Sequence, residues 1–216
     1  MWEQSSIGTA SFRISGWNLR VEHKPDGLRM TTSLDQSAQL GSLLSLTGSN
    51  FPMLAESFIR GDELHLIMPH SNRMDVGLEI ALMVIQADDE CFILETTLSL
   101  QTQSLDSYPG VRLDVAGSVP LVASTKNTAR LFSSGMADHP DAKLLYVSVF
   151  VDERDQLSIH ETTGGTQAIE FFGDFMEKGV IRKVQPWWVW SSPKLSDSQL
   201  IKFAESLSKR PLPLTS

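Results

Sequence analysis

Two short stretches combine histidine with carboxylates, the side chains that most often carry acid–base chemistry. Residues 138–141 read Asp-His-Pro-Asp, and residues 160–166 read His-Glu-Thr-Thr-Gly-Gly-Thr. If the fold brings the two stretches together, they form a small acid–base site. The candidate catalytic residues of that site are His139, Asp141, His160 and Glu161. Solvated loops explain both stretches more simply, because neither shows the paired ligand spacing of a zinc site. A small enzyme is therefore the alternative interpretation and not the favoured one.

The glycine pair Gly164-Gly165 also raises the question of an anion site, because it precedes an expected helix. Backbone N–H groups at a helix N-terminus attract phosphate or carboxylate groups. The stretch nevertheless lacks the lysine of a P-loop and the spacing of a dinucleotide fingerprint. An ordinary loop that connects a strand to a helix is the favoured interpretation.

Cys91 is the single cysteine, so the chain can form no internal disulfide and no thiolate metal cluster. Three acidic residues, 88–90, precede it, and nearby negative charge raises the pKa of a thiol and lowers its reactivity. The sequence also contains no Gly-x-Ser-x-Gly motif, so no nucleophile stands out. We therefore predict a structural role for Cys91, no disulfide-linked partner, no metal and no cofactor.

The stretch 180–190 carries three of the five tryptophans and is the strongest candidate for a binding surface. The predicted binding residues are Trp187, Trp188, Trp190 and Arg182. Pro186 donates no ladder hydrogen bond, which places it on an edge strand or at a bulge. Large aromatic side chains anchor both cores and interfaces, so the strand is either core or a contact surface. An exposed aromatic edge would favour a protein partner or self-association into a homodimer.

The charge balance argues against nucleic acid as the main partner. The formal net charge is -8, whereas binding to a phosphate backbone depends on lysine and arginine. A single-stranded nucleic-acid binder, using Arg182, Lys183 and the tryptophans as stacking platforms, remains a second alternative.

Compartment and membrane signals point to a soluble, cytoplasmic protein. The first residues form neither a basic nor an apolar segment of the kind found in export signals. The longest apolar run, 80–85, is far shorter than the roughly 20 residues that span a bilayer. We expect no membrane contact.

Hairpin signals dominate the first half of the chain. The runs 54–60 and 63–68 flank Gly61-Asp62, and the runs 76–86 and 91–101 flank an acidic tip. Further strands are expected at 10–21 with a bulge at Gly16, at 28–34, and at 111–115 in the same sheet as the hairpins. The stretch 35–51 reads as a short helix or an ordered loop.

The second half predicts a third hairpin and two helices. The runs 144–151 and 156–160 form the hairpin, after a boundary region that contains a weak amphipathic segment at 125–132. Helical spacing of apolar residues predicts a helix at 166–178. A second helix at 196–209 begins with a capping box, Ser196 to Gln199.

These elements predict an α+β fold, with a mostly antiparallel sheet built from hairpins and the two helices packed on one face. The chain divides into a hairpin-rich half, 1–120, and an α/β half, 121–216, within one compact unit. Because no catalytic motif is convincing, we expect a non-catalytic binding or protein-interaction module.

Overall fold

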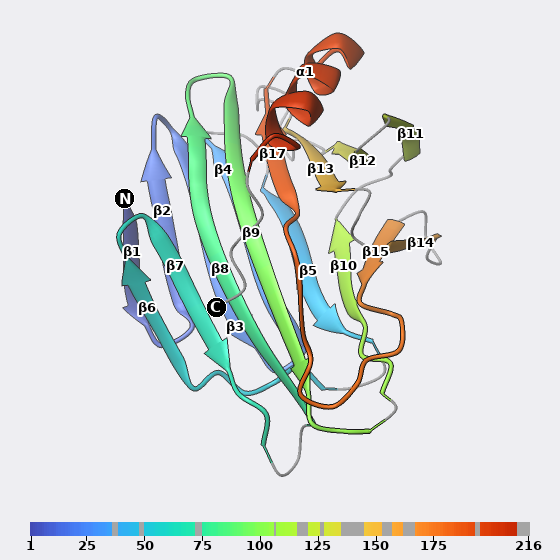
Figure 1. Ribbon diagram of the computed structural model, residues 1–216. Coiled ribbons are helices and arrows are strands. Elements are labelled where there is room, and N and C mark those ends of the chain that lie inside the picture. Colours follow the sequence, from blue (N-terminus) through green and yellow to red (C-terminus); the bar gives the residue numbers. More distant parts are fainter. Residues whose placement is uncertain are drawn as a thin grey trace.

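The structure is a computed structural model that describes residues 1–35, 39–47, 50–71, 75–105, 107–115, 121–125, 128–134, 145–152, 157–161, 167–192 and 195–210. Within these residues the chain forms two antiparallel sheets and one helix (Figure 1). The expected α+β class with two helices is therefore wrong. The described chain is a two-sheet sandwich in which nearly all regular structure is strand.

The first sheet has eight strands. In spatial order they are β1 (Trp2–Ser6), β2 (Thr9–Ile14), β3 (Trp17–Lys24), β4 (Gly27–Leu34), β5 (Leu40–Leu46), β10 (Val111–Val115), β15 (Gln167–Phe171) and β14 (Leu157–Glu161). Strands of the second half, β14 and β15, complete this sheet beside β10 of the first half.

The second sheet has nine strands. In spatial order they are β11 (Leu121–Thr125), β12 (Thr128–Ser134), β13 (Tyr146–Asp152), β17 (Trp187–Ser191), β9 (Cys91–Thr102), β8 (Val76–Ala87), β7 (Glu63–Met68) and β6 (Glu56–Arg60), and β16 (Ile181–Val184) also pairs with β9. The predicted hairpins β6–β7 and β8–β9 are both present.

The core lies between the sheets and is centred on aromatic rings. Phe92 of the nine-stranded sheet contacts Phe12 at a ring-centroid distance of 5.9 Å and Trp17 at 5.7 Å, both from the eight-stranded sheet. It also contacts Trp190 of its own sheet at 5.7 Å. Because aromatic side chains bury large apolar areas, this cluster fixes the two sheets to each other.

The turn between β2 and β3 differs from the expected bulged strand at 10–21. Ser15 and Gly16 both have a left-handed backbone, with φ of 47° and 79°. Two consecutive residues of positive φ make the two-residue turn that matches the twist of a hairpin. The chain therefore reverses at Gly16, and the apolar alternation on either side belongs to two strands.

The strand β15 occupies the position of the expected helix at 166–178. It is paired on one side with β10 and on the other with β14, and Phe172, the first residue after the strand, has a φ of 63°. Apolar residues at 168, 171 and 172 fit a helical stripe, but a buried interior strand followed by a turn produces the same spacing. This segment forms a strand and not a helix because it pairs with a neighbouring strand on each side.

Four more expectations about secondary structure and strand pairing are wrong. The stretch 35–51 contains the strand β5, and the segment at 125–132 falls on the strands β11 and β12. β10 pairs in the eight-stranded sheet, not in the sheet of the hairpins. β13 and β14 do not form a hairpin, because they lie in different sheets.

The C-terminal helix α1 (Asp197–Leu207) confirms the predicted capping box. The Ser196 backbone N–H donates to Gln199 Oε1 at 2.9 Å, and the Gln199 N–H donates to Ser196 Oγ at 3.4 Å. These bonds satisfy donors that a helix start otherwise leaves unpaired. Among the described residues, no helix is long and apolar enough to cross a membrane.

Candidate functional site

The outer face of the nine-stranded sheet is divided into a covered half and an open half. Helix α1 covers the first half and packs its buried stripe on strands β9, β13 and β17. The residues of this second hydrophobic cluster are Cys91, Ile93, Phe150, Trp187, Val189, Leu200, Ala204 and Leu207. Within the described residues no helix covers the open half, which comprises β6, β7, β8, the far end of β9, and β16.

Strand register sets the rows of side chains on the open half. Residues directly opposite each other in paired strands share a face, and every second residue belongs to that face. One row runs Ile67, Glu79, Ser99 and Lys183 across β7, β8, β9 and β16. The next row toward the strand ends contains Gly77, Gln101 and Ile181.

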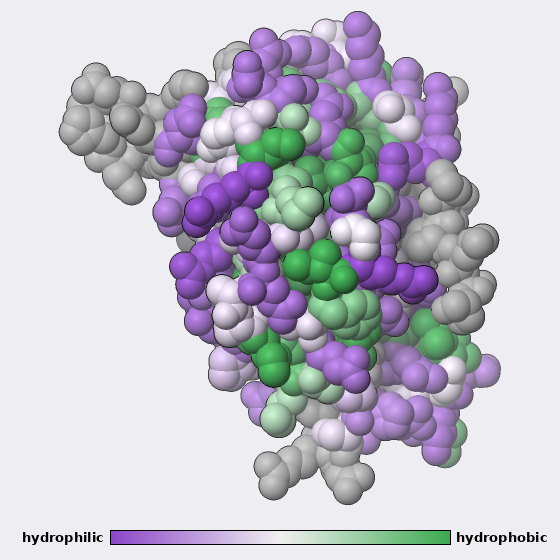
Figure 2. All heavy atoms as spheres, turned by 90° about the vertical axis from the view of Figure 1, so that its left-hand side faces the viewer, coloured by the Kyte–Doolittle hydropathy of each residue, from purple (hydrophilic) through white to green (hydrophobic). Residues whose placement is uncertain are grey.

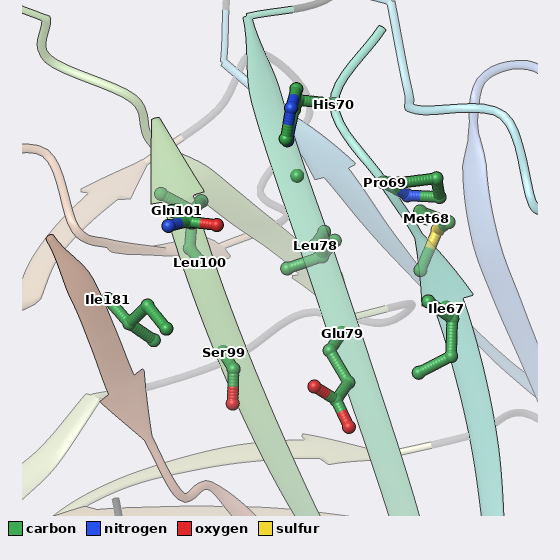
Figure 3. Close-up of a pocket in the computed structure, with 11 residues that line it drawn as sticks. Ile67, Met68, Pro69, His70, Leu78, Glu79, Ser99, Leu100, Gln101 and Ile181 are labelled. Carbon is green, nitrogen blue, oxygen red and sulfur yellow. The ribbon is translucent and has the colours of Figure 1, made fainter. Parts of the chain in front are cut away.

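Apart from Lys183, the residues of these two rows line a shallow hollow of about 270 Å³ on the sheet surface. Figure 3 shows Ile67 and Ile181 on opposite sides, with Glu79 and Ser99 between them. The hollow is also lined by Met68, Pro69, His70, Gly77, Leu78, Leu100 and Gln101. The small side chain of Ser99 at its floor leaves room that a larger side chain would fill.

Two contacts position residues of the hollow, one at Gln101 and one at the His70 backbone. Gln101 Nε2 donates to the carbonyl oxygen of Gly179 at 3.2 Å, which fixes the amide and leaves its oxygen as an acceptor. A Cβ at Gly77 would lie 3.1 Å from the backbone nitrogen of His70. The glycine therefore permits the close approach that seats His70 at the rim. Together the carboxylate of Glu79, the hydroxyl of Ser99, the amide of Gln101 and the imidazole of His70 offer both donors and acceptors.

An aromatic pair stands beside the hollow on the same face. Phe58 of β6 stacks on His65 of β7 with ring centroids 5.0 Å apart and planes 9° apart. His65 Nε2 lies 2.9 Å from Glu63 Oε2, but the orientation of the two groups is not that of a hydrogen bond. The contact is an ion pair only when the imidazole carries a proton on both nitrogens.

The predicted tryptophan surface is not exposed. Trp187, Trp188 and Trp190 are each 1% exposed, and β17 is an interior strand between β13 and β9. Of the two alternatives for this strand, core or contact surface, the structure therefore shows the core. Arg182 donates through Nη2 to the Phe175 carbonyl oxygen at 2.7 Å and braces the preceding loop.

The acid–base alternative falls largely outside the described residues. His139 and Asp141 lie in the gap at 135–144, and residues 162–166, with the glycine pair, lie in another gap. His160 and Glu161 belong to β14, whose backbone alone is described. The proximity of the two stretches remains a prediction. The glycine pair does not precede a helix, because the next element is the strand β15.

Cys91 is buried beneath helix α1, as expected of a structural thiol. Burial, together with the charges of Asp88 and Glu90, raises the pKa of the Cys91 thiol to about 12. Within the described part of the chain, no group of three metal-ligating residues gathers at one point.

We expect Cys91 to resist alkylation by iodoacetamide in the native protein at neutral pH, because almost no thiolate forms and the sulfur is buried. The same residue should react fully once the chain is unfolded in guanidinium chloride. Mass spectrometry of both samples checks this. Rapid labelling of the native protein would show that α1 opens readily or that the thiol is activated.

Comparison with known proteins gives a likeness of fold alone. No protein-family model matches the sequence, and no curated protein matches it. A solved structure of a heparinase III gene product matches with a TM-score of 0.53 at 10% sequence identity. The match covers 91% of this chain and 36% of that chain, so the present chain spans about a third of that protein's length.

Proposed function

We propose that this chain is a non-catalytic binding module that takes one unit of a neutral saccharide in the hollow on its nine-stranded sheet. The observation that carries the proposal is the open half-face itself. Helix α1 covers the neighbouring half with apolar contacts, whereas Glu79, Ser99 and Gln101 remain around a space large enough for a ring-sized ligand.

The chemistry of the lining favours a hydroxyl-rich ring. A carboxylate and an amide oxygen accept hydrogen bonds from neighbouring hydroxyl groups, and a serine hydroxyl both donates and accepts. Ile67 and Ile181, on opposite sides, match the apolar C–H surfaces of such a ring. A few convergent polar groups within an apolar lining are typical of small-molecule sites, and the hollow lies near the lower end of their size range.

Charge argues against an anionic ligand. The hollow contains the exposed carboxylate of Glu79, and the chain has a formal net charge of -8. An anionic polymer would be repelled by the carboxylate in the hollow and by the net negative charge of the whole chain. The heparinase III likeness, at 10% identity, concerns the fold and carries no activity to this chain.

Filling the hollow tests the proposal. We expect Ser99→Trp to abolish binding to glucose, mannose or galactose oligomers in isothermal titration calorimetry, because the indole would occupy the ligand's space. Ser45→Trp is the matched control, since Ser45 lies on β5 of the other sheet and is likewise half-buried. The control should bind like the natural chain.

Two results would contradict the proposal. The first is that the natural chain binds none of these neutral oligomers. The second is that Ser99→Trp and Ser45→Trp bind equally well, which would place the ligand elsewhere on the molecule.

A further inference from the structure

Strand β6 is an open edge of the nine-stranded sheet. It pairs with β7 on one side, and it ends the strand order. The Ser57 carbonyl accepts a hydrogen bond from Gln4 Nε2 of β1 at 3.2 Å, so this carbonyl points away from β7. Backbone groups alternate in direction along a strand, so those of Ile59 face the same open side. Among the described strands none pairs with this side of β6, and such an edge is a template for another strand.

The side chains on this edge carry opposite charges at equal distances on either side of a central aromatic residue. Glu56, Phe58 and Arg60 all lie on the outer face, opposite Ile67, His65 and Glu63 of β7. Glu56 and Arg60 are exposed, and within the described residues neither makes an ion pair or a side-chain hydrogen bond. Phe58 is 39% exposed between them.

A second copy of β6 fits this order when it runs antiparallel about a two-fold axis at Phe58. Ser57 of one copy then lies opposite Ile59 of the other, and their outward backbone groups form hydrogen-bonded pairs, in which the Ser57 carbonyl accepts through the lone pair that Gln4 Nε2 leaves free. Phe58 meets its own counterpart, and Glu56 lies opposite Arg60 in both symmetry-related positions. These last pairs are the closely spaced ones, with Cα atoms about 4.5 Å apart. A parallel pairing in register would instead oppose Glu56 to Glu56.

Exposed apolar side chains flank the same edge. The backbone N–H of Gly8 donates to Ser57 Oγ at 3.1 Å, which places the neighbouring Ile7 beside β6. Ile7 is 73% exposed, Met53 is 82% exposed and Ile59 is 37% exposed. Figure 2 views the side that carries β1 and β6 and shows hydrophobic residues along its middle among hydrophilic ones.

We propose that two copies of this chain associate by antiparallel pairing of β6 with β6, which joins their nine-stranded sheets into one. The two-fold axis keeps both outer faces on the same side of the joined sheet. The two hollows then face the same way, and a ligand of repeating units gains by binding both. The pairing itself does not depend on the ligand.

Charge reversal tests the pairing through sedimentation equilibrium of the full chain. Glu56→Arg replaces two opposite-charge pairs with two like-charge pairs, and Arg60→Glu does the same with the other sign. We expect each to weaken dimerisation by about tenfold or more. The double variant Glu56→Arg/Arg60→Glu restores both pairs and should dimerise like the natural chain. Glu177→Arg, an exposed site on a distant loop, is the control for a change in net charge.

Circular dichroism of each variant establishes that it is folded before its association is measured. A natural chain that stays monomeric at every concentration would overturn the proposal. So would single reversals that dimerise like the natural chain, or a folded double variant that fails to recover.

Discussion

Replacing Trp188 with alanine should lower the free energy of unfolding by about 3–5 kcal/mol. Trp188 is 1% exposed, and its ring stacks on Trp190 with centroids 5.6 Å apart and planes 6° apart. Its indole N–H donates to the buried hydroxyl of Thr96 at 3.1 Å. The substitution removes this bond and leaves a cavity where the core cannot easily close. Urea denaturation followed by tryptophan fluorescence and circular dichroism measures the change.

Tyr108→Ala provides the comparison, because it removes an aromatic side chain that is 68% exposed. Surface changes of this kind usually alter stability by less than about 0.5 kcal/mol. If both variants had the same small effect, the tryptophan strand would not be part of the core, and the position of β17 within the sheet would be wrong.

Replacing Glu95 with alanine should destabilise the chain by about 1–3 kcal/mol and loosen the end of α1. Glu95 Oε2 accepts a hydrogen bond from Arg210 Nε at 2.6 Å and another from the Trp187 indole N–H at 2.9 Å. The Glu95 side chain is 9% exposed, whereas that of Arg210 is 37% exposed. Loss of the carboxylate leaves a buried indole N–H without its acceptor and frees the segment after the helix.

A double-mutant cycle with Arg210→Ala isolates the contribution of the ion pair. We expect a coupling free energy of at least about 0.5 kcal/mol, together with faster hydrogen exchange across α1 in either single variant. Glu205→Ala, an exposed site on the same helix, is the control and should leave exchange unchanged. Purely additive effects would show that the contact does not hold the helix on the sheet.

Local signals predicted those elements whose partners are adjacent in sequence. The β6–β7 and β8–β9 hairpins were recognisable because a turn signal separates two strand-like runs. Helix α1 was recognisable because its capping box is contained in four consecutive residues, Ser196 to Gln199. The helix expected at 166–178 failed because β15 is stabilised by β10, more than fifty residues earlier, and no local pattern reveals that pairing.

The tryptophan strand shows the same limit on function. Pro186 indicated either an edge or a bulge, and it lies between β16 and β17, both of which pair with β9. Its carbonyl oxygen accepts a hydrogen bond from Thr96, so β9 continues across the interruption. The strand is therefore interior, and its three tryptophans pack on both sides of the sheet.

The hollow was not predicted from the sequence because it depends on how neighbouring strands are aligned with one another. Glu79, Ser99 and Ile181 come from three strands, and they meet only because β8 and β16 both pair with β9 in a fixed alignment. Each residue alone reads as an ordinary position on a sheet surface. Alternation showed which residues share a face along one strand, but it gave no information about their neighbours across the sheet.

Chemical-shift mapping of the isotope-labelled chain with a neutral oligosaccharide tests the central claim most directly. The proposal predicts that the largest amide shifts fall at Gly77, Glu79, Ser99, Gln101 and Ile181 and saturate together. Shifts confined to the eight-stranded sheet, or to the stretches around His139 and His160, would contradict it and would favour a site elsewhere in the chain.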